Sequence, residues 1–231
     1  MAITTIRYGL GRVGLWLSLF CTGGLLLATS LLFKTDEIIV KADVDRKFAL
    51  AVDFDKLRQI LLRTDATKSI VEHGGMKLLD KSIESLDIDL SRDSRPLLNA
   101  LKGKSKTDIS VSRRLMVQMI DPQLEANELA LIQHAEIHPN DLHVNTKSDR
   151  PTGKLEGYQT KLDAVKEGGE SEVKLSTQMS VVVRVSPLFL GVAQSRVTKA
   201  ANDGLRDQES AIRNLVSMHD DRMIILPTLG P

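Results

Sequence analysis

Residues 173–204 read VKLSTQMSVVVRVSPLFLGVAQSRVTKAANDG. Up to Val185, every second side chain is apolar or threonine, a pattern that predicts a strand with one buried face. Ser186 and Pro187 follow, and they favour a helix start because serine caps a helix and proline fits its first position. The stretch therefore predicts a long helix placed directly after a strand, and this junction decides the fold.

The predicted helix carries small residues on the face that would pack inward. This face recurs at intervals of three and four residues, as Val197, Ala201, Gly204, Gln208, Ala211 and Leu215. Charged residues fill the opposite side, as expected for a helix that packs on one face only. Alanine and glycine let a helix backbone approach a sheet closely, or they leave space beside it.

The strand before the helix is the second arm of a predicted hairpin. Leu155–Val165 forms the first arm, the turn reads KEGGES, and Glu172–Val185 forms the second arm. In the first arm Tyr158 and Thr160 share one face, because alternate residues of a strand point to the same side. The two arms are expected to contribute neighbouring strands to one sheet.

The rest of the chain predicts short helices and further strands. Asp53 suits the N-cap of a helix over FDKLRQILL, and Ala66–His73 fits a turn or a short helix. Residues 92–106 form a basic insertion. Further strands are predicted at Asp36–Val52 (one or two strands), Ile83–Leu90, Thr107–Ile120, Glu128–Ile137 and Leu142–Thr146. Because strands and helices do not alternate, the sheet is expected to be antiparallel.

Three segments carry a resemblance to a known superfamily. They read EIIVKADVDRKFALAVDFDKLRQIL, LEGYQTKLDAVKEGGESEVKLSTQMSVVVRV and AQSRVTKAANDGLRDQESAIRNL. In this order, residues 36–218 resemble the START-like superfamily (SRPBCC, polyketide cyclase and Bet v 1). The resemblance implies an α+β helix-grip domain, in which about six or seven curved antiparallel strands surround a long C-terminal helix. It also implies a cavity between sheet and helix that takes lipids, sterols, polyketides or other apolar molecules.

Before this domain lies a segment long and apolar enough to cross a membrane. The 21 residues of 13–33 contain no charge, and as a helix they would span about 30 Å. A cleaved signal peptide with Ala28-Thr29-Ser30 at its cleavage site is the alternative, but the apolar run continues through Phe33. We therefore expect a short tail at 1–12, an uncleaved transmembrane helix at 13–33, and an apolar tail at 219–231.

The orientation in the cell membrane follows less directly from the charges. A strict count of lysine and arginine near the span favours a cytoplasmic domain. A short basic N-terminal tail, with Arg7 and Arg12, instead usually stays inside. We expect the soluble domain on the outer side, periplasmic or extracellular. Cys21 is the one cysteine of the chain and falls within the span, so no disulfide is expected in the domain.

Arg113 breaks the pattern of its strand. In TDISVSRRLMVQM it falls on the face of Ile109, Val111 and Leu115, which is otherwise apolar. A buried guanidinium needs a partner, so Arg113 is a candidate for binding the carboxylate or phosphate of an amphipathic ligand. A bulge that turns Arg113 and Arg114 outward, or an arginine that reaches out at the end of the strand, are the alternatives.

Other functional classes find little support in the sequence. His134, Glu136 and His138 share a face, but it is opposite the apolar face of their strand, so a solvated surface is expected rather than a metal site. Aromatic residues make up 3% of the chain and its formal net charge is +1, which gives nucleic-acid binding no basis. No nucleophile elbow or phosphate-binding glycine loop is present, and the chain is expected not to be an enzyme and to need no cofactor.

The leading hypothesis is a single-pass membrane protein whose domain binds a hydrophobic or lipid-like ligand. The alternative is a structural or assembly module with a filled core that contacts another membrane protein. A cavity beneath the last helix would favour the first, whereas a core closed by Met119, Met179 and Leu205 would favour the second. The expected pocket residues are Arg113, Tyr158, Thr160, Thr177, Met179, Val181, Ala201 and Gly204.

Overall fold

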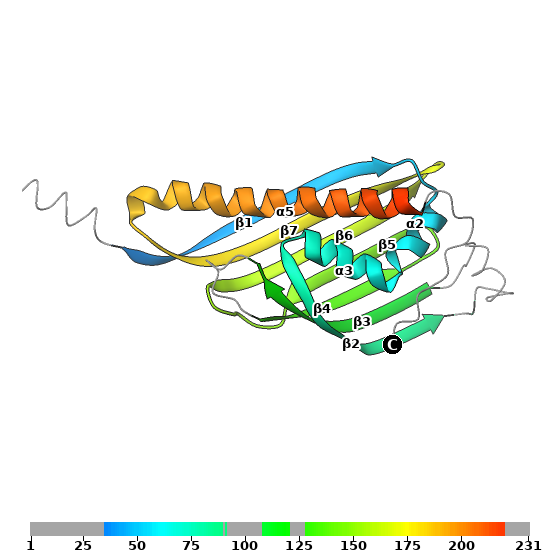
Figure 1. Ribbon diagram of the computed structural model, residues 1–231, viewed down its shortest axis with the longest axis horizontal. Coiled ribbons are helices and arrows are strands. Elements are labelled where there is room, and N and C mark those ends of the chain that lie inside the picture. The colour runs from blue at the N-terminus through cyan, green and yellow to red at the C-terminus, as the bar shows by residue number, and fades with distance from the viewer. Residues whose placement is uncertain (1–34, 90, 92–107, 121–127, 220–231) are drawn as a thin grey trace, which may run out of the picture.

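The computed structural model describes residues 35–89, 91, 108–120 and 128–219. In these residues one seven-stranded antiparallel sheet carries a long helix and two short helices on the same face (Figure 1). This arrangement fits a helix-grip fold, so the predicted α+β class is confirmed.

The elements follow one another in the order that the sequence predicts. Strand β1 is followed by two helices, six further strands, a single 3-10 turn (η2) and the terminal helix α5. Their bounds are β1 Asp36–Leu50, α2 Phe54–Leu61, α3 Thr64–His73, β2 Met76–Asp89, β3 Asp108–Met119, β4 Leu129–Ile137, β5 Asp141–Ser148, β6 Leu155–Glu167, β7 Glu170–Val185, η2 Pro187–Phe189 and α5 Leu190–Met218.

The first and last strands are neighbours in the sheet, whose order is β1-β7-β6-β5-β4-β3-β2. Asp36 lies opposite Val185 and Leu50 lies opposite Ser171, so β1 and β7 pair along their whole common length. After β1, the chain crosses the inner face of the sheet through α2 and α3 and starts β2 at the other edge. Each later strand then pairs with the one before it.

Local sequence signals explain several ends of elements. The Asp53 carboxylate accepts a hydrogen bond of 2.9 Å from the backbone N–H of Asp55 and so caps α2, as predicted. The hairpin between β6 and β7 turns at Gly168, whose φ of +61° is a conformation that glycine adopts without strain. Both features follow from the sequence alone.

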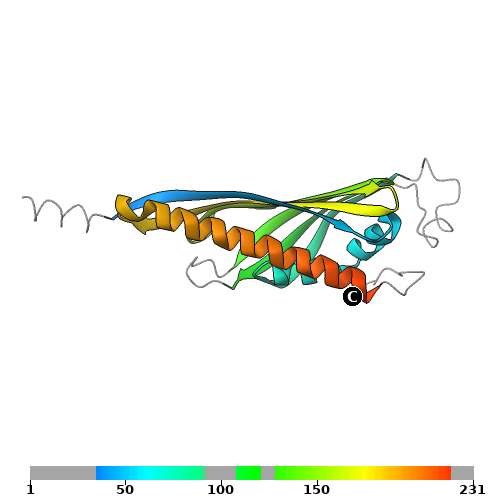
Figure 2. The same cartoon turned by 90° about the horizontal axis from the view of Figure 1, so that it is seen from above.

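Helix α5 lies along β1 and β7, and its packed face is the one with small residues (Figure 2). Ala201, Leu205 and Ile212 are buried there against the two strands and α3. An ionic contact fixes the same interface, because the Glu209 carboxylate on α5 pairs with Arg46 of β1 and with Arg213 one turn further along α5. Helix α5 therefore folds back over β7, the strand that it follows in the sequence.

Two elements differ from the sequence prediction. The residues after Ser186 form the turn η2 before α5 begins at Leu190, and the Ser186 side chain makes no capping hydrogen bond to it. Strand β2 begins at Met76 rather than at Ile83, and of its fourteen residues Met76 alone is buried. Its apolar side chains at the edge of the sheet are therefore largely open to solvent.

Some predictions concern residues outside the described ranges: the transmembrane helix at 13–33, the basic insertion at 92–106, and the apolar tail beyond His219. Because residues 13–33 lie outside the described part, the structure gives no support to the predicted membrane anchor. Within the described part, no helix combines the length and the apolar character needed to span a bilayer.

Candidate ligand-binding site

A cavity of about 620 Å³ lies between α3 and the inner face of the sheet. This volume is within the range of pockets that hold small organic molecules. Most of its wall is apolar and comes from α3 and from strands β3 to β7. Apart from two residues of β2 at its opening, the apolar lining consists of Ile70, Val71, Met76, Val111, Leu131, Ala135, Ile137, Leu142, Val144, Leu162 and Leu175, with Leu61 and Leu62 at the end of α2.

The cavity opens at the edge strand β2. Ile83 and Leu86 belong to its lining, yet their side chains are 69% and 55% exposed. Lys81 and Ser82 stand beside them at the same edge. Side chains that both line a cavity and face solvent mark its mouth, so a ligand would enter between α3 and β2.

Helix α5 contributes a single residue, Gln208, to the lining. Over β1 and β7 the space beneath this helix is occupied by buried side chains such as Leu205 and Met179. The open space is therefore under the short helix α3, beside the long helix rather than beneath it. This differs from the expected position, because α5 packs so closely on its two strands that no volume is left there.

A row of polar residues crosses the inner face of the sheet. Successive members are direct cross-strand partners, so their side chains lie on the same face. The row runs from β3 to β7 as Arg113, Gln133, Thr146, Thr160 and Thr177. Four of the five, all except Thr177, belong to the cavity lining. The cavity therefore has apolar walls crossed by one polar band.

Hydrogen bonds hold the start of this row in place. The Gln133 Oε1 atom accepts from Arg113 Nε, and Gln133 Nε2 donates to the Thr146 hydroxyl over 2.8 Å. Arg113 Nη2 donates to the Thr67 hydroxyl of α3 over 2.9 Å. The chain of contacts ties α3 to three strands and fixes the guanidinium plane within the cavity.

Arg113 has no acidic partner among the described residues. Its two hydrogen bonds go to neutral oxygens, and burial lowers the pKa of its guanidinium below the ordinary value, with no carboxylate to offset the effect. Nη1 makes no hydrogen bond to any of these residues. A half-buried arginine with a free N–H edge is a binding group for a carboxylate or a phosphate.

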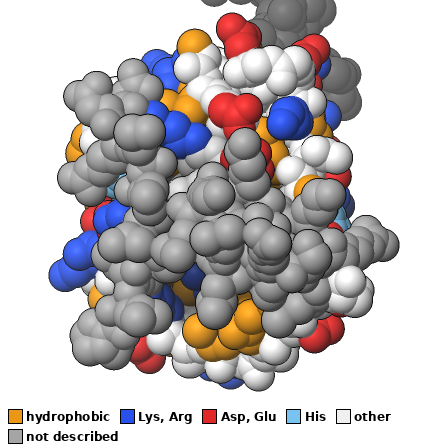
Figure 3. All heavy atoms as spheres, turned by 90° about the vertical axis from the view of Figure 1, so that its right-hand side faces the viewer, with side chains coloured by type: hydrophobic (Ala, Val, Ile, Leu, Met, Phe, Trp, Pro, Cys, Tyr) orange, Lys and Arg blue, Asp and Glu red, His pale blue; other side chains and the backbone are white. Residues whose placement is uncertain are grey.

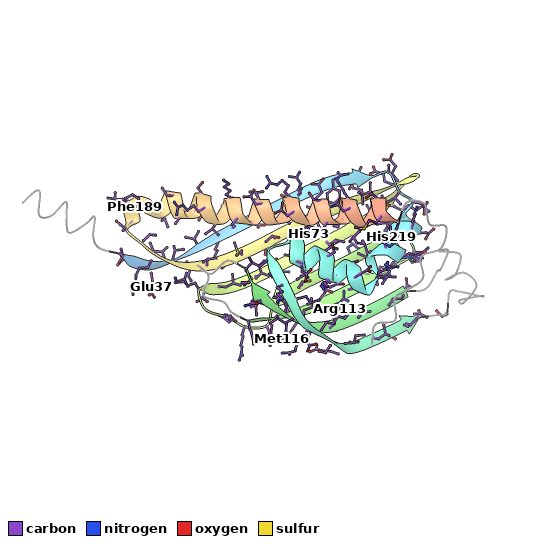
Figure 4. All side chains as sticks on the ribbon, in the orientation of Figure 1. Glu37, His73, Arg113, Met116, Phe189 and His219 are labelled. Atoms are coloured by element: carbon purple, nitrogen blue, oxygen red, sulfur yellow. The ribbon has the colours of Figure 1, made fainter. Side chains whose placement is uncertain are left out.

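Strand β3 keeps its alternation through this point. It pairs with β4 in continuous register from Ile109 to Val117, so Arg113 points inward and Arg114 outward. Arg114 meets Glu84 and Asp149 on the outer face, each over 3.1 Å. The irregularity lies in the partner strand β2, between Ile83 and Ser85. Figure 4 shows Arg113 in the part of the sheet that α3 covers.

Tyr158 is a further buried residue of the cavity that carries a polar group. Burial raises the pKa of its phenol, and a hydrogen bond with the Thr160 side chain offsets part of the rise. The phenol is therefore protonated at neutral pH and serves as a hydrogen-bonding group, not as an anion. Its backbone N–H donates to the Ser148 hydroxyl, which adds to the hold on this part of β6.

The structure brings three of the eight expected pocket residues together. Arg113, Tyr158 and Thr160 line the cavity. The other five are not in its lining and lie at the packed interface of α5 with β1, β7 and α3, as Thr177, Met179, Val181, Ala201 and Gly204. Gly204 stands close to the end of α3, where a Cβ atom would meet the Gly74 carbonyl oxygen at 3.8 Å.

Sequence reasoning missed Thr67, Gln133, Thr146 and Gln208 in the lining. Gln133 had a usable signal, because it stands on the inward face of β4 between Leu131 and Ala135. A polar residue at an inward position is the same kind of exception as Arg113. That Gln133 lies opposite Arg113 depends on the register between β3 and β4, and the sequence does not reveal this register.

His134 of β4, His138 directly after β4 and His143 of β5 lie on the outer face of the sheet, as the sequence predicts for the first two. His134 contacts Ser112 and Glu136, and His138 contacts Asp108. His143 lies between Asp163 at 2.7 Å and Asp141 at 3.2 Å. The hydrogen bond to Asp163 raises the pKa of His143. No group of three ligands suited to a metal ion is found among the described residues.

Comparisons with known proteins bear on the fold. No protein-family model and no curated protein matches the sequence. Among solved structures, a START superfamily protein from Mycobacterium smegmatis covers 76% of this chain and 97% of its own, at 15% identity and a TM-score of 0.40. The Zhui aromatase/cyclase from Streptomyces sp. R1128 covers 79% and 94%, at 10% identity and a TM-score of 0.41.

Norcoclaurine synthase from Thalictrum flavum, solved with dopamine and hydroxybenzaldehyde, covers 94% of this chain and 98% of its own. The identity is 14% and the TM-score 0.34. At such values the resemblance concerns the fold alone and says nothing of what this chain binds. The structural neighbours are nevertheless START-like and aromatase/cyclase proteins, the group that the sequence resembles.

These neighbours correct one prediction. The chain was expected not to be an enzyme, because its inward faces offer few acid–base groups. Norcoclaurine synthase and the aromatase/cyclase are enzymes, and they are structural neighbours of this chain. The expectation, which rested on the lack of a catalytic motif in the sequence, is therefore corrected, because enzymes are found among the structural neighbours.

Proposed function

We propose that the domain binds an amphipathic small molecule with an acidic head group in the cavity under α3. The apolar body of the ligand would lie against residues such as Leu131, Val144 and Leu162. Its head group would meet Arg113 at the polar row. Entry would occur at β2, where the cavity is open.

The observation that carries this proposal is the state of Arg113. Arg113 is half-buried, and a guanidinium that loses part of its hydration and is held by neutral groups alone carries a cost, since no opposite charge replaces the lost water. Proteins normally place a carboxylate beside such a group, and none of the described residues supplies one. An anionic ligand would provide the missing partner.

The shape of the site supports an amphipathic ligand over a wholly polar one. Apolar side chains make up most of the wall, and the polar groups converge in one band. Sites of this kind gain affinity from the apolar wall and orientation from a few placed hydrogen bonds. A free inorganic anion would use Arg113 and leave most of the cavity unfilled.

The rival hypothesis was a structural module with a filled core. It describes the region under α5 well, where Met179 and Leu205 are buried. It leaves the cavity under α3 and the unpaired arginine without an explanation. We therefore prefer ligand binding.

The test compares three ligands of equal chain length on the full-length protein in lipid nanodiscs: dodecanoate, dodecyl phosphate and dodecanol. Captured ligand is quantified by mass spectrometry after the discs are isolated. Arg113→Met is expected to weaken the binding of both anions by about tenfold to a hundredfold, since a charge-assisted hydrogen bond contributes about 1.5–3 kcal/mol. Binding of the alcohol should stay unchanged.

Arg114→Met is the matched control, because it removes the neighbouring arginine from the outer face of the same strand. It should leave all three affinities unchanged. Equal binding of the anions to the wild type and to Arg113→Met would refute the assignment of the head group. Failure of the wild type to take up any of the three would refute the ligand class.

The cellular location belongs to the same proposal. The uncharged segment 13–33 would anchor the protein in a cell membrane by a single pass, with the domain on the outer side. The full chain is expected to resist carbonate extraction. Protease is expected to cleave the domain when it is added to cells whose outer membrane, if they have one, has been removed. Release by carbonate would contradict the anchor, and protection from protease would contradict the orientation.

A further inference from the structure

An uninterrupted apolar run is exposed where α5 begins. Residues 187–192 read PLFLGV, and all six are exposed. The side chains of Leu188, Phe189, Leu190 and Val192 are 67%, 53%, 37% and 52% exposed. The run covers the turn η2 and the first residues of α5, whereas the residues of α5 from Ala201 onward pack against the core. The exposure is therefore confined to one end of the helix.

The exposed run has no partner within the described residues. The buried residues of α5 begin at Ala201, and Val197 is the earlier residue that packs partly against the core. Single exposed apolar residues are common on protein surfaces, but a run of this length is a liability unless it serves contact with something else. We therefore expect an apolar partner to cover residues 187–192.

The run lies at the end of the molecule where the chain enters β1. Val185, two residues before Pro187, is the direct partner of Asp36, the first residue of β1. Figure 4 shows Phe189 and Glu37 at this end of the molecule and His219 at the other. The uncharged segment 13–33 stops three residues before Asp36, a distance of about 10 Å at most.

Polar groups border the run on both sides. Glu37 and Arg184 form an exposed ion pair of 3.1 Å next to it, and Gln194 donates a hydrogen bond to the Lys41 carbonyl oxygen where the run ends. At the opposite end, seen from the right-hand side of Figure 1, the described side chains are a mixture of basic, acidic and hydrophobic groups (Figure 3). An apolar tip with a charged border matches the layered structure of a membrane surface.

We propose that residues 187–192 are a membrane-docking surface that enters the interfacial layer of the bilayer crossed by segment 13–33. The position of segment 13–33, within about 10 Å of β1, is the argument for lipid as the occupant. The C-terminal tail is a poor candidate, because it leaves from the far end of a 29-residue helix, about 44 Å away. The proposal rests on the membrane anchor of the proposed function, but not on what the cavity binds.

The test places a fluorescent label at single positions of the full-length chain in vesicles of phosphatidylcholine and phosphatidylglycerol. Cys21→Ser removes the native cysteine, and Val192→Cys or Ser210→Cys provides the labelling site. Both positions are exposed residues of α5, so neither substitution disturbs the core. A nitroxide carried on lipid acyl chains should quench the label at 192 and leave the label at 210 unchanged.

A second variant separates docking from mere nearness to the bilayer. Leu188→Asp with Phe189→Asp, in the chain labelled at 192, should abolish most of the quenching while the thermal unfolding midpoint stays the same. Absence of quenching at 192 in the unmodified run would overturn the proposal. So would energy transfer between labels at 192 on two copies, because a second copy of the chain would then cover the surface.

Discussion

Arg113 and Arg114 show how one strand position decides the role of a side chain. The two residues are neighbours in sequence and carry the same charge, but β3 turns one toward the cavity and the other toward solvent. Arg114 is balanced by Glu84 and Asp149. Arg113 meets Thr67 and Gln133, which carry no charge. The difference in function that we propose therefore rests on the alternation of the strand.

Two glycines at the contact of α3 and α5 have opposite tolerance for a side chain. A Cβ atom at Gly74 would meet the Gln208 side chain at 2.5 Å, whereas one at Gly204 would meet its nearest neighbour at 3.8 Å. Gly74→Ala is expected to lower the free energy of unfolding by about 1 kcal/mol, because the buried Gln208 amide must shift. Gly204→Ala is expected to raise it by about 0.5–1 kcal/mol, because alanine favours a helix interior.

Urea denaturation of the two variants beside the wild type measures both changes. Gly204 also bears on the cavity, because the sequence analysis placed it in the lining. In the structure it lies at a packed contact, and Gly204→Ala should leave the binding of dodecanoate unchanged. Stabilisation by Gly74→Ala, or loss of binding in Gly204→Ala, would contradict this view of the contact.

At the scale of elements, α5 is held to β1 by charge as well as by apolar packing. The Glu209 side chain is 12% exposed and lies between Arg46 and Arg213. The Arg213 guanidinium also stacks over the Phe48 ring at 5.0 Å. Burial tends to raise the pKa of Glu209, but the two arginines outweigh it and the pKa falls below its ordinary value of 4.5.

This contact predicts a pH-dependent part of the stability. Because the folded-state pKa of Glu209 is depressed, its contribution is complete above about pH 4.5 and is lost as the pH falls through the folded pKa. Glu209→Gln is expected to cost about 2 kcal/mol at neutral pH, as for a hydrogen bond between charged groups. The loss of stability caused by Glu209→Gln should become smaller as the pH falls below about 4.5.

Urea denaturation of wild type and Glu209→Gln between neutral pH and pH 3 gives the difference at each pH. Glu37→Gln is the control, since it breaks the solvent-exposed pair with Arg184 and should change the stability little. A cost for Glu209→Gln that is the same at pH 3 and pH 7 would show that packing, and not charge, holds this part of α5.

The sequence predicts the elements well because their signals are local. Alternation in 173–185, the Asp53 cap and the glycine turn at 168–169 each act over a few residues, and the structure has the strand, the helix and the hairpin there. Strand β2 was predicted too short because its first half has no regular alternation. It is an edge strand, so its apolar residues need not be buried.

The cavity could be predicted in part. Arg113 was found because it interrupts an apolar face, and Tyr158 and Thr160 because they alternate toward the core. The position of the cavity could not be predicted from the sequence, because periodicity shows which face of a strand is covered but not which helix covers it. Thr177 and Met179 face inward, as predicted, but α5 covers them, while α3 stands over Arg113 and Gln133.

Over the whole molecule, packing divides the domain into two parts. Strands β1 and β7 with α5 form a closed part, in which most inward side chains of 40–50, 173–181 and 201–215 are buried. Strands β2 to β6 with α3 surround the cavity, and β2 is almost entirely exposed. Regions with few buried contacts open locally at low free energy, so the second part should exchange its amide hydrogens faster.

A ligand in the cavity should slow this exchange on one side of the domain only. It stabilises the states that retain the cavity, and at a hundred times its dissociation constant the local opening should become rarer by about a hundredfold. Hydrogen exchange measured by mass spectrometry, with and without dodecanoate, is expected to show protection in peptides from α3 and β2. Peptides from 170–185 and 201–215 should change little, because that part is already closed. Protection centred on α5 would instead place the ligand beneath the long helix, where the structure has packed side chains.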